Sequence, residues 1–119
     1  MLAHVGFEVS DLARSARFYD AVFYALGIRR LHENEHVIGW GQVDPMFWIT
    51  ARNAPQPTYG HVALKARGKS GVDAAHAAGI AHGGRDDGAP GPRPQYGPSY
   101  YAAYMRDPDG LRVEVVSQQ

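Results

Sequence analysis

The sequence contains no cysteine, which excludes a disulfide framework and thiolate chemistry and is typical of a reducing compartment. No apolar run approaches the length that crosses a bilayer, and residues 1–10 lack the basic start and apolar core of a signal peptide. Neither sign of charge is in excess, because 12 Lys and Arg stand against 12 Asp and Glu, and no basic stripe favours nucleic acid. These absences predict a cytoplasmic protein whose partner is a small molecule, uncharged or of mixed charge, and neither a membrane nor a nucleic acid.

The first half of the chain reads as a strand, a helix and further strands, and the total of 119 residues is typical of a single domain. Residues 3–9 alternate with apolar odd positions, the period of a half-buried strand, so His4 faces away from the apolar side. Ser10 and Asp11 then offer a cap for an amphipathic helix that Gly27 ends. The short strands predicted after this helix cover residues 37–42 and 46–50.

A similar pattern restarts after the proline-containing connector 51–60. Residues 61–66 alternate as the first strand does, with His61 on the side opposite the apolar positions. Ser70, followed by Asp73, resembles a capping box that opens an alanine-rich helix. The remaining predicted features are a helix end at Gly83 and Gly84, a glycine- and proline-rich loop at 88–98, strands at 100–106 and 111–116, and a tight turn at 107–110 between them.

The two halves match at a fixed offset, since 61 − 4 = 57 and the same shift carries Gly27 onto Gly84. An internal repeat of strand, helix and strands is the economical interpretation. Each half alone would leave the apolar face of its sheet poorly covered. Pairing the halves predicts one antiparallel-rich sheet, with helices on its apolar side and a concave opposite side.

Three residues are predicted on the concave side, namely His4, His61 and Glu114. Glu114 stands in the middle of an alternating strand among apolar neighbours, so its charge needs a partner. Two histidines and a carboxylate are the ligand types of sites that hold a divalent metal while leaving positions open for water or substrate. The alternative is that Glu114 pairs with Arg112 or Lys65 on the sheet surface, and that the histidines are ordinary residues at strand ends.

Two short motifs are rejected because of their context. Residues 32–36, HENEH, match the H-E-x-x-H pattern of zinc proteases, but that motif works on a helix and this polar stretch is soon followed by Gly39 and Gly41. Residues 68–70, GKS, resemble the end of a phosphate-binding loop, but Ala63 occupies the position of the required earlier glycine. Neither proteolysis nor nucleotide binding is therefore predicted.

Aromatic residues are numerous for so short a chain, and such residues commonly line pockets for small organic ligands as well as cores. Alternation places Tyr100 and Tyr104 on one side of their strand and Tyr101 on the other, so they cannot all line one cavity. Trp48 and Tyr96 are candidates for substrate contact. Arg93, in the predicted loop, is the candidate for an anionic group of the substrate.

The sequence resembles the glyoxalase, bleomycin-resistance and extradiol dioxygenase superfamily, also called the vicinal oxygen chelate superfamily, over nearly the whole chain. The segments that carry the resemblance are HVGFEVSDLARSARFYDAVFYALGI, GHVALKA and YYAAYMRDPDGLRVEVV. The resemblance implies an α+β fold of two βαβββ modules, about 1–54 and 58–119, which form an open cupped mixed sheet with helices on one face. It also implies metal ligands on the first and last strands of the modules, which are His4, His61 and Glu114 here, for an ion such as Zn, Fe, Mn, Ni or Co.

The chain departs from this family in residues 46–50, where glyoxalase I proteins carry a further glutamate and this chain has Phe47, Trp48, Ile49 and Thr50. That difference disfavours lactoylglutathione lyase chemistry, because its proton transfer needs a second acid near the metal. The order and spacing of the ligands are also similar to those of fosfomycin-resistance transferases. Bleomycin-resistance members lack the ligands, so their retention argues against that branch.

The predicted function is that of a metal-dependent lyase, transferase or dioxygenase in which the cation polarises an oxygen of a small substrate. Glu114 is expected to serve catalysis as well as the metal, with Tyr101 as an auxiliary donor. The alternative is a metal-free protein whose aromatic cup binds a small molecule or drug. Because cupped sheets of this superfamily commonly pair and dimerisation covers an open edge, we expect a homodimer, with His4 and His61 contributed to one site by different subunits.

Overall fold

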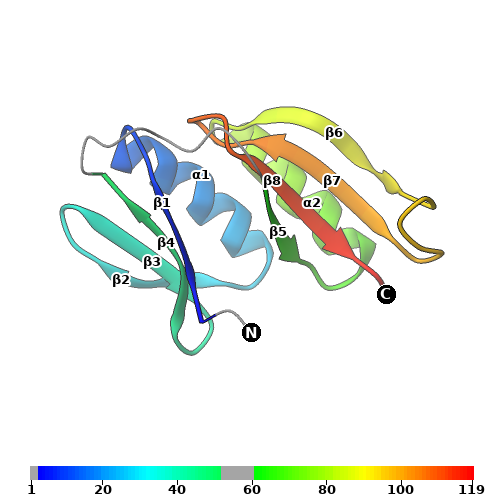
Figure 1. Cartoon of the computed structure of the whole chain (residues 1–119), viewed down its shortest axis with the longest axis horizontal. Helices are drawn as coiled ribbons and strands as arrows, with labels where there is room; N and C mark the ends of the chain where they lie inside the picture. Colours follow the sequence, from blue (N-terminus) through cyan, green and yellow to red (C-terminus); the bar gives the residue numbers. More distant parts are fainter. Residues whose placement is uncertain (1–2, 52–60) are drawn as a thin grey trace.

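The computed structural model describes residues 3–51 and 61–119, and these form the two modules of an α+β fold. The predicted connector lies outside the described residues except for Ala51. Figure 1 shows the sheets of the two modules at opposite ends of the long axis. The first module consists of β1 (Val5–Glu8), α1 (Leu12–Ala25), β2 (Arg29–Glu33), β3 (Val37–Gly41) and β4 (Pro45–Thr50). The second consists of β5 (His61–Lys65), α2 (Gly68–Ala81), β6 (Arg85–Pro92), β7 (Tyr101–Arg106) and β8 (Arg112–Ser117).

Both modules have the same topology, which confirms the βαβββ repeat. The strand order is β1-β4-β3-β2 in the first sheet and β5-β8-β7-β6 in the second. In each sheet the first and last strands of the module pair in parallel and the other neighbours are antiparallel. The prediction of one continuous sheet is replaced by two four-stranded sheets among the described residues, because no ladder joins β1 to β5 within this chain.

The helices differ in how their first turns are capped. The side chain of Asp11 accepts a hydrogen bond from the Arg14 backbone N–H at 3.0 Å, and Gly27, at a φ of 77°, follows the end of α1. Both signals were predicted from the sequence. In α2 the cap position is Arg67 with no side-chain hydrogen bond, and Ser70 lies inside the first turn. The predicted capping box at Ser70 is therefore wrong.

Two edge strands were not predicted. β6 covers RDDGAPGP, more than half of which falls in the segment expected to be a loop, and its register against β7 shifts on both sides of Gly88. Its composition hides it because glycine and proline are depleted in strands, although proline is tolerated on an edge whose outer N–H groups need no ladder partner. β2, RRLHE, carries charge at most positions and also lies at an edge. Composition therefore failed at these two edge strands, whereas alternation revealed the edge strands β1 and β5.

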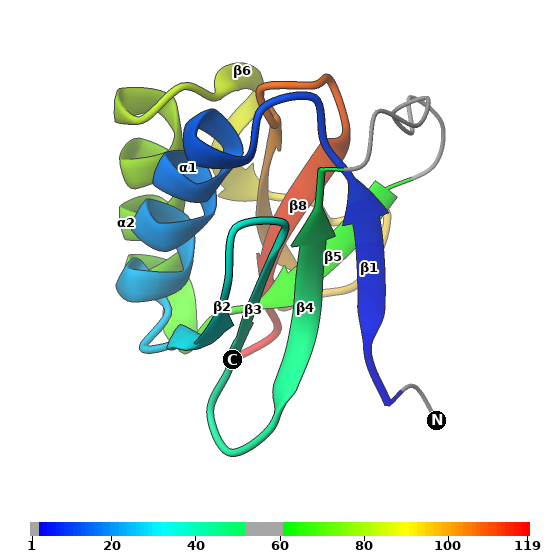
Figure 2. The same ribbon diagram turned by 90° about the vertical axis from the view of Figure 1, so that its left-hand side faces the viewer.

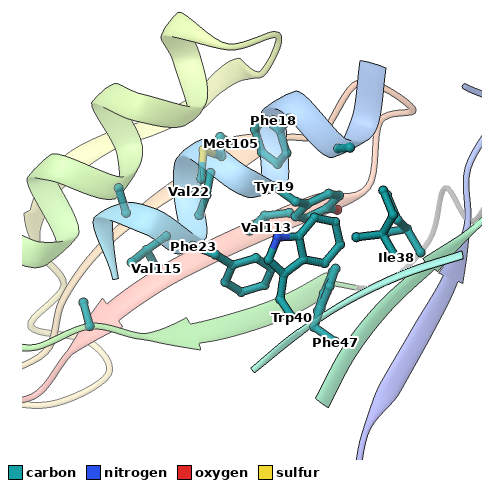
Figure 3. Close-up of a cluster of buried hydrophobic side chains, with 14 of the residues drawn as sticks. Phe18, Tyr19, Val22, Phe23, Ile38, Trp40, Phe47, Met105, Val113 and Val115 are labelled. Atoms are coloured by element: carbon teal, nitrogen blue, oxygen red, sulfur yellow. The ribbon is translucent and has the colours of Figure 1, made fainter. Parts of the chain in front are cut away.

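A single hydrophobic core joins the two modules (Figure 3). From α1 come Phe18, Tyr19, Val22 and Phe23, which meet Trp40 and Phe47 of the first sheet, and Met105, Val113 and Val115 of the second. The helical period of α1 places its apolar residues on one stripe, and α1 and α2 lie side by side over the two sheets (Figure 2). Trp40 and Phe47 therefore belong to this core.

Hydrogen bonds between the modules fix how they sit against each other. The buried hydroxyl of Tyr19 donates to Oδ2 of Asp107 at 2.7 Å, in the turn between β7 and β8. The other oxygen of Asp107 accepts from the backbone N–H groups of Asp109 and Leu111, as an aspartate in such a turn is expected to do. The backbone of Ser10 donates to Asp109 at 3.0 Å. The predicted tight turn thus also serves as a contact between the modules.

No helix within residues 3–51 and 61–119 combines the length and apolar character needed to cross a membrane.

Candidate active site

Glu114 lies in the middle of β8 on the face of the second sheet that points away from the helices. Its neighbours Val113 and Val115 are completely buried in the core, so alternation directs Glu114 to the opposite face. The residue is nevertheless only 3% exposed. A carboxylate buried to this degree requires polar partners.

Both oxygens of the carboxylate have a side-chain partner. Nε2 of His61 lies 3.5 Å from Oε1, and the hydroxyl of Tyr100 donates to Oε2 at 2.5 Å. The hydrogen bond to Glu114, together with burial, raises the pKa of Tyr100 to about 12. Tyr100 therefore remains a proton donor to Glu114 throughout the neutral range. The alternative of a surface ion pair with Arg112 does not hold, because Arg112 bonds Asp87 at 3.0 Å and its guanidinium lies 4.1 Å from the Tyr104 ring centroid.

The His61 and Glu114 pair has the spacing of two ligands on one metal ion. Ligand bonds of about 2.0–2.2 Å at a tetrahedral angle place two ligand atoms roughly 3.4 Å apart, close to the observed 3.5 Å between Nε2 and Oε1. The hydrogen bond from Tyr100 is the kind of outer contact that orients a metal-binding carboxylate. These residues fit a divalent cation as half of a site, with two protein ligands.

The third predicted ligand, His4, does not join this pair within the chain. No group of three potential ligand side chains that could hold a metal occurs within residues 3–51 and 61–119. His4 is exposed just before β1 and lines a cavity of about 720 Å³ together with residues of both sheets, including Phe47, Val62 and Leu64. The strands β1 and β5 that border this cavity are both edges of their sheets.

Tyr101, predicted as an auxiliary donor, is not brought to Glu114. Its hydroxyl donates to Asp73 of α2 at 2.7 Å, on the helix side of the sheet, and this bond raises the pKa of Tyr101. Tyr100 takes the expected place instead. Strand alternation could have identified Tyr100 from the sequence. Tyr104 pairs with Glu114 across the ladder, and Tyr100, four residues before Tyr104, points to the same face of the sheet.

Of the predicted substrate residues, two lie beside Glu114 and one lies on the other sheet. The ring centroid of Tyr96 is 5.4 Å from that of Tyr100, and the guanidinium carbon of Arg93 is 5.5 Å from the ring centroid of Tyr104. Trp48 lies on the first sheet, where a Cβ built on Gly39 would meet its ring at 2.7 Å and the ring of His32 is 5.5 Å away.

Trp48 occupies the place in the first module that Glu114 occupies in the second. Gly6 of β1 pairs with Trp48 of β4, just as Ala63 of β5 pairs with Glu114 of β8. The ladders therefore confirm that a tryptophan stands where the repeat would place a second acid. The HENEH segment belongs to β2 and the turn after it, so it forms no helix and no protease motif.

Comparison with known proteins agrees with the fold. The model of the Glyoxalase/Bleomycin resistance protein/Dioxygenase superfamily matches residues 1–115, and the chain belongs to this superfamily. A glyoxalase/bleomycin resistance protein from Albidiferax ferrireducens is 34% identical over 98% of both chains, with a TM-score of 0.88. No curated protein sequence matches the chain.

More distant structures share the architecture. A glyoxalase I variant from Zea mays is 26% identical over 97% of this chain and 45% of its own, with a TM-score of 0.75. The fosfomycin resistance protein FosX from Listeria monocytogenes is 20% identical over 98% of this chain and 91% of its own, with a TM-score of 0.72. At that identity the likeness to FosX shows the fold alone.

Proposed function

We propose that the chain is a divalent-metal-dependent enzyme that acts on a small oxygenated substrate in the cytoplasm, and that its site is completed in a homodimer. His61 and Glu114 of one subunit hold the ion together with His4 of the partner subunit, and water or substrate fills the remaining positions. The observation that carries the proposal is the His61 and Glu114 pair, set at ligand spacing with the carboxylate buried and oriented by Tyr100.

The topology of the sheets supports a site shared between two copies. His4 and His61 stand at equivalent positions of the two modules, but a single chain does not bring them together. The strands that carry or follow them, β1 and β5, are edges with unpaired backbone groups. A two-fold dimer that places β1 beside β5 of the other copy covers both edges and makes two identical sites.

The metal, when bound, polarises a substrate oxygen and stabilises the negative charge that develops on it. The residues of this chain perform the remaining tasks. Tyr100 holds the Glu114 carboxylate in place and retains its own proton at neutral pH. Tyr96 and Tyr100 provide an aromatic wall beside the ligands. Because Trp48 replaces the second acid, transfer or oxygenation is better supported than a lyase reaction that shuttles a proton between two carboxylates.

Metal binding to the purified protein tests this proposal. The parent should bind a first-row divalent ion, and its melting temperature should rise with metal concentration and fall again on chelation. Glu114→Gln and His61→Ala should each weaken binding by about a hundredfold or more, because a ligand matters at least as much as the outer contacts whose loss costs about 10–100-fold.

His32→Ala is the matched control, because His32 is an exposed histidine on β2 that lies outside the ligand pair. It should bind metal as the parent does. If the two ligand variants bind metal as tightly as the parent, or if the parent has no metal affinity, the enzyme proposal fails. The metal-free small-molecule binding protein then takes its place.

A further inference from the structure

Arg93 is held on the Glu114 face of the second sheet without a carboxylate partner among the described residues. Its Nη2 donates to the carbonyl oxygen of Ala89 at 2.8 Å and its Nη1 to that of Pro92 at 3.5 Å. The guanidinium also lies over the ring of Tyr104. These contacts position the group but leave its charge uncompensated, and a guanidinium has five N–H donors, of which the contacts use two.

The glycines of β6 provide the space in which Arg93 lies. A Cβ built on Gly91 would stand 3.3 Å from Nη1 of Arg93. A Cβ on Gly88 would stand 3.6 Å from Nη2 and 3.0 Å from the Tyr104 ring, and Gly88 also has a φ of 152°. Side chains at these positions would crowd the guanidinium or the ring beneath it. The absence of side chains at Gly88 and Gly91 of β6 thus leaves room for the Arg93 guanidinium to lie against the strand.

Two other arginines on this part of the sheet, Arg106 and Arg112, share one carboxylate. Nε of Arg106 and Nε of Arg112 lie 3.1 and 3.0 Å from the same oxygen of Asp87. Around Tyr104, three guanidinium groups therefore face two carboxylates, Asp87 and Glu114, which leaves an excess of one positive charge before any metal binds. The formal charge of zero for the whole chain conceals this local excess.

We propose that Arg93 binds an oxyanion of the substrate, a carboxylate or phosphate-type group, while the other end of the same molecule reaches the ion at His61 and Glu114. This inference rests on the proposed function for the metal end alone. Tyr104 connects the two ends, because it is the ladder partner of Glu114 and its ring lies under Arg93. The substrate class is then a small oxygenated acid, since a planar guanidinium with free donors matches an oxyanion in charge and geometry.

The anion end can be tested on metal-free protein with simple probes. Benzoate and phenyl phosphate represent the two oxyanion types, and benzamide is the neutral isostere of benzoate. By titration calorimetry, the parent should bind both anions at least about tenfold more tightly than Arg93→Gln does, as expected for loss of a charge-assisted bidentate contact. It should also prefer benzoate to benzamide. Arg93→Lys keeps the charge without the fork and should recover only part of the affinity.

Lys65→Gln is the matched control, because it removes one positive charge from the exposed edge strand β5 of the same sheet. It should leave anion binding unchanged. Equal anion affinities of the parent and Arg93→Gln, or equal weakening by Lys65→Gln, would overturn the inference. Binding of only one of the two anion types assigns the substrate to that type.

Metal affinity of Arg93→Gln, measured in parallel, separates this inference from the proposed function. Anion binding that needs Arg93 in a protein without metal affinity sinks the enzyme proposal and leaves the oxyanion site. If the protein binds metal but its anion binding does not depend on Arg93, the enzyme proposal stands and the oxyanion site is excluded.

Discussion

The two modules repeat one backbone pattern but carry different chemistry at the equivalent central position. In the first module Trp48 lies opposite Gly39, and a side chain on Gly39 would meet the tryptophan ring. In the second module Glu114 lies opposite Tyr104 and is bonded by a further tyrosine, Tyr100. The repeat therefore fixes where side chains emerge from the sheets, whereas the residue at each position decides what chemistry the module can support.

The two equivalent histidines, His4 and His61, also differ in their surroundings. His61 has Glu114 as a neighbour in its own module, whereas His4 has no carboxylate at the equivalent place, because Trp48 occupies it. One module therefore holds two candidate ligands side by side and the other holds a single one. The proposed site accordingly combines the first module of one copy with the second module of another.

The change expected to have the largest effect is Trp48→Glu, which makes the first module like the second. In the dimer it adds a carboxylate to the ligands His4, His61 and Glu114, and metal affinity should rise about 10–100-fold, as expected for a further ligand. Isothermal titration with Zn²⁺ or Ni²⁺ measures the change. Trp48→Gln, similar in shape to the glutamate but neutral, should show no such gain, and equal affinities of the two variants would contradict the equivalence of the modules.

Tyr19→Phe tests the contact between the modules. Loss of the hydroxyl leaves Asp107 without a hydrogen-bond donor at a buried oxygen, which should lower the free energy of unfolding by about 1–3 kcal/mol. Urea denaturation measures the loss. Tyr24→Phe on the same helix is the control, because Tyr24 is 84% exposed. Losses of the same size in both variants would show that the bond to Asp107 adds nothing.

Tyr100→Phe distinguishes the role of Tyr100 from that of Tyr101, the adjacent tyrosine whose side chain points to the opposite face of the sheet. Without the hydrogen bond, Glu114 loses the contact that orients it, and metal affinity should fall by about tenfold. Tyr101→Phe removes only the bond to Asp73 on the helix side and should leave metal affinity unchanged. The reverse order of effects would restore Tyr101 as the donor.

The smallest expected effect is a pH dependence of stability that arises from Asp86 on the edge strand of the second module. Hydrogen bonds from the backbone of Gly88 and from His76 of α2 lower the pKa of Asp86 in the folded state. A lowered carboxyl pKa stabilises the fold above the unfolded value of about 4, and this contribution is lost as pH falls through the folded value.

Melting temperatures measured between pH 2 and 5 should therefore fall less steeply with acid in Asp86→Asn than in the parent. Asp44→Asn, at an exposed turn of the first module, is the control and should follow the parent curve. Parallel curves for the parent and Asp86→Asn would remove this contribution.

The sequence was sufficient for the elements that have strong local signals. Alternation gave β1, β5 and β8 and the face on which Glu114 lies, and the cap at Asp11 gave the start of α1. β6 escaped prediction because it is held by its ladder to one neighbour and by contacts to α2 rather than by a composition typical of strands. Periodicity also fixes the face of a residue but not which sheet edges meet, so the separation of His4 from His61 required three-dimensional structure.

The most direct test of the shared site is complementation between two inactive variants. His4→Ala and Glu114→Gln chains should each bind metal weakly as homodimers. In a mixed dimer, His4 of the Glu114→Gln chain meets His61 and Glu114 of the His4→Ala chain, so one intact site forms. Unfolding and refolding the two variants together should restore tight binding of about one ion per mixed dimer, because one of the two symmetry-related sites is intact. Metal affinity that stays as weak in the mixture as in the separate variants, or a monomeric parent, would contradict it.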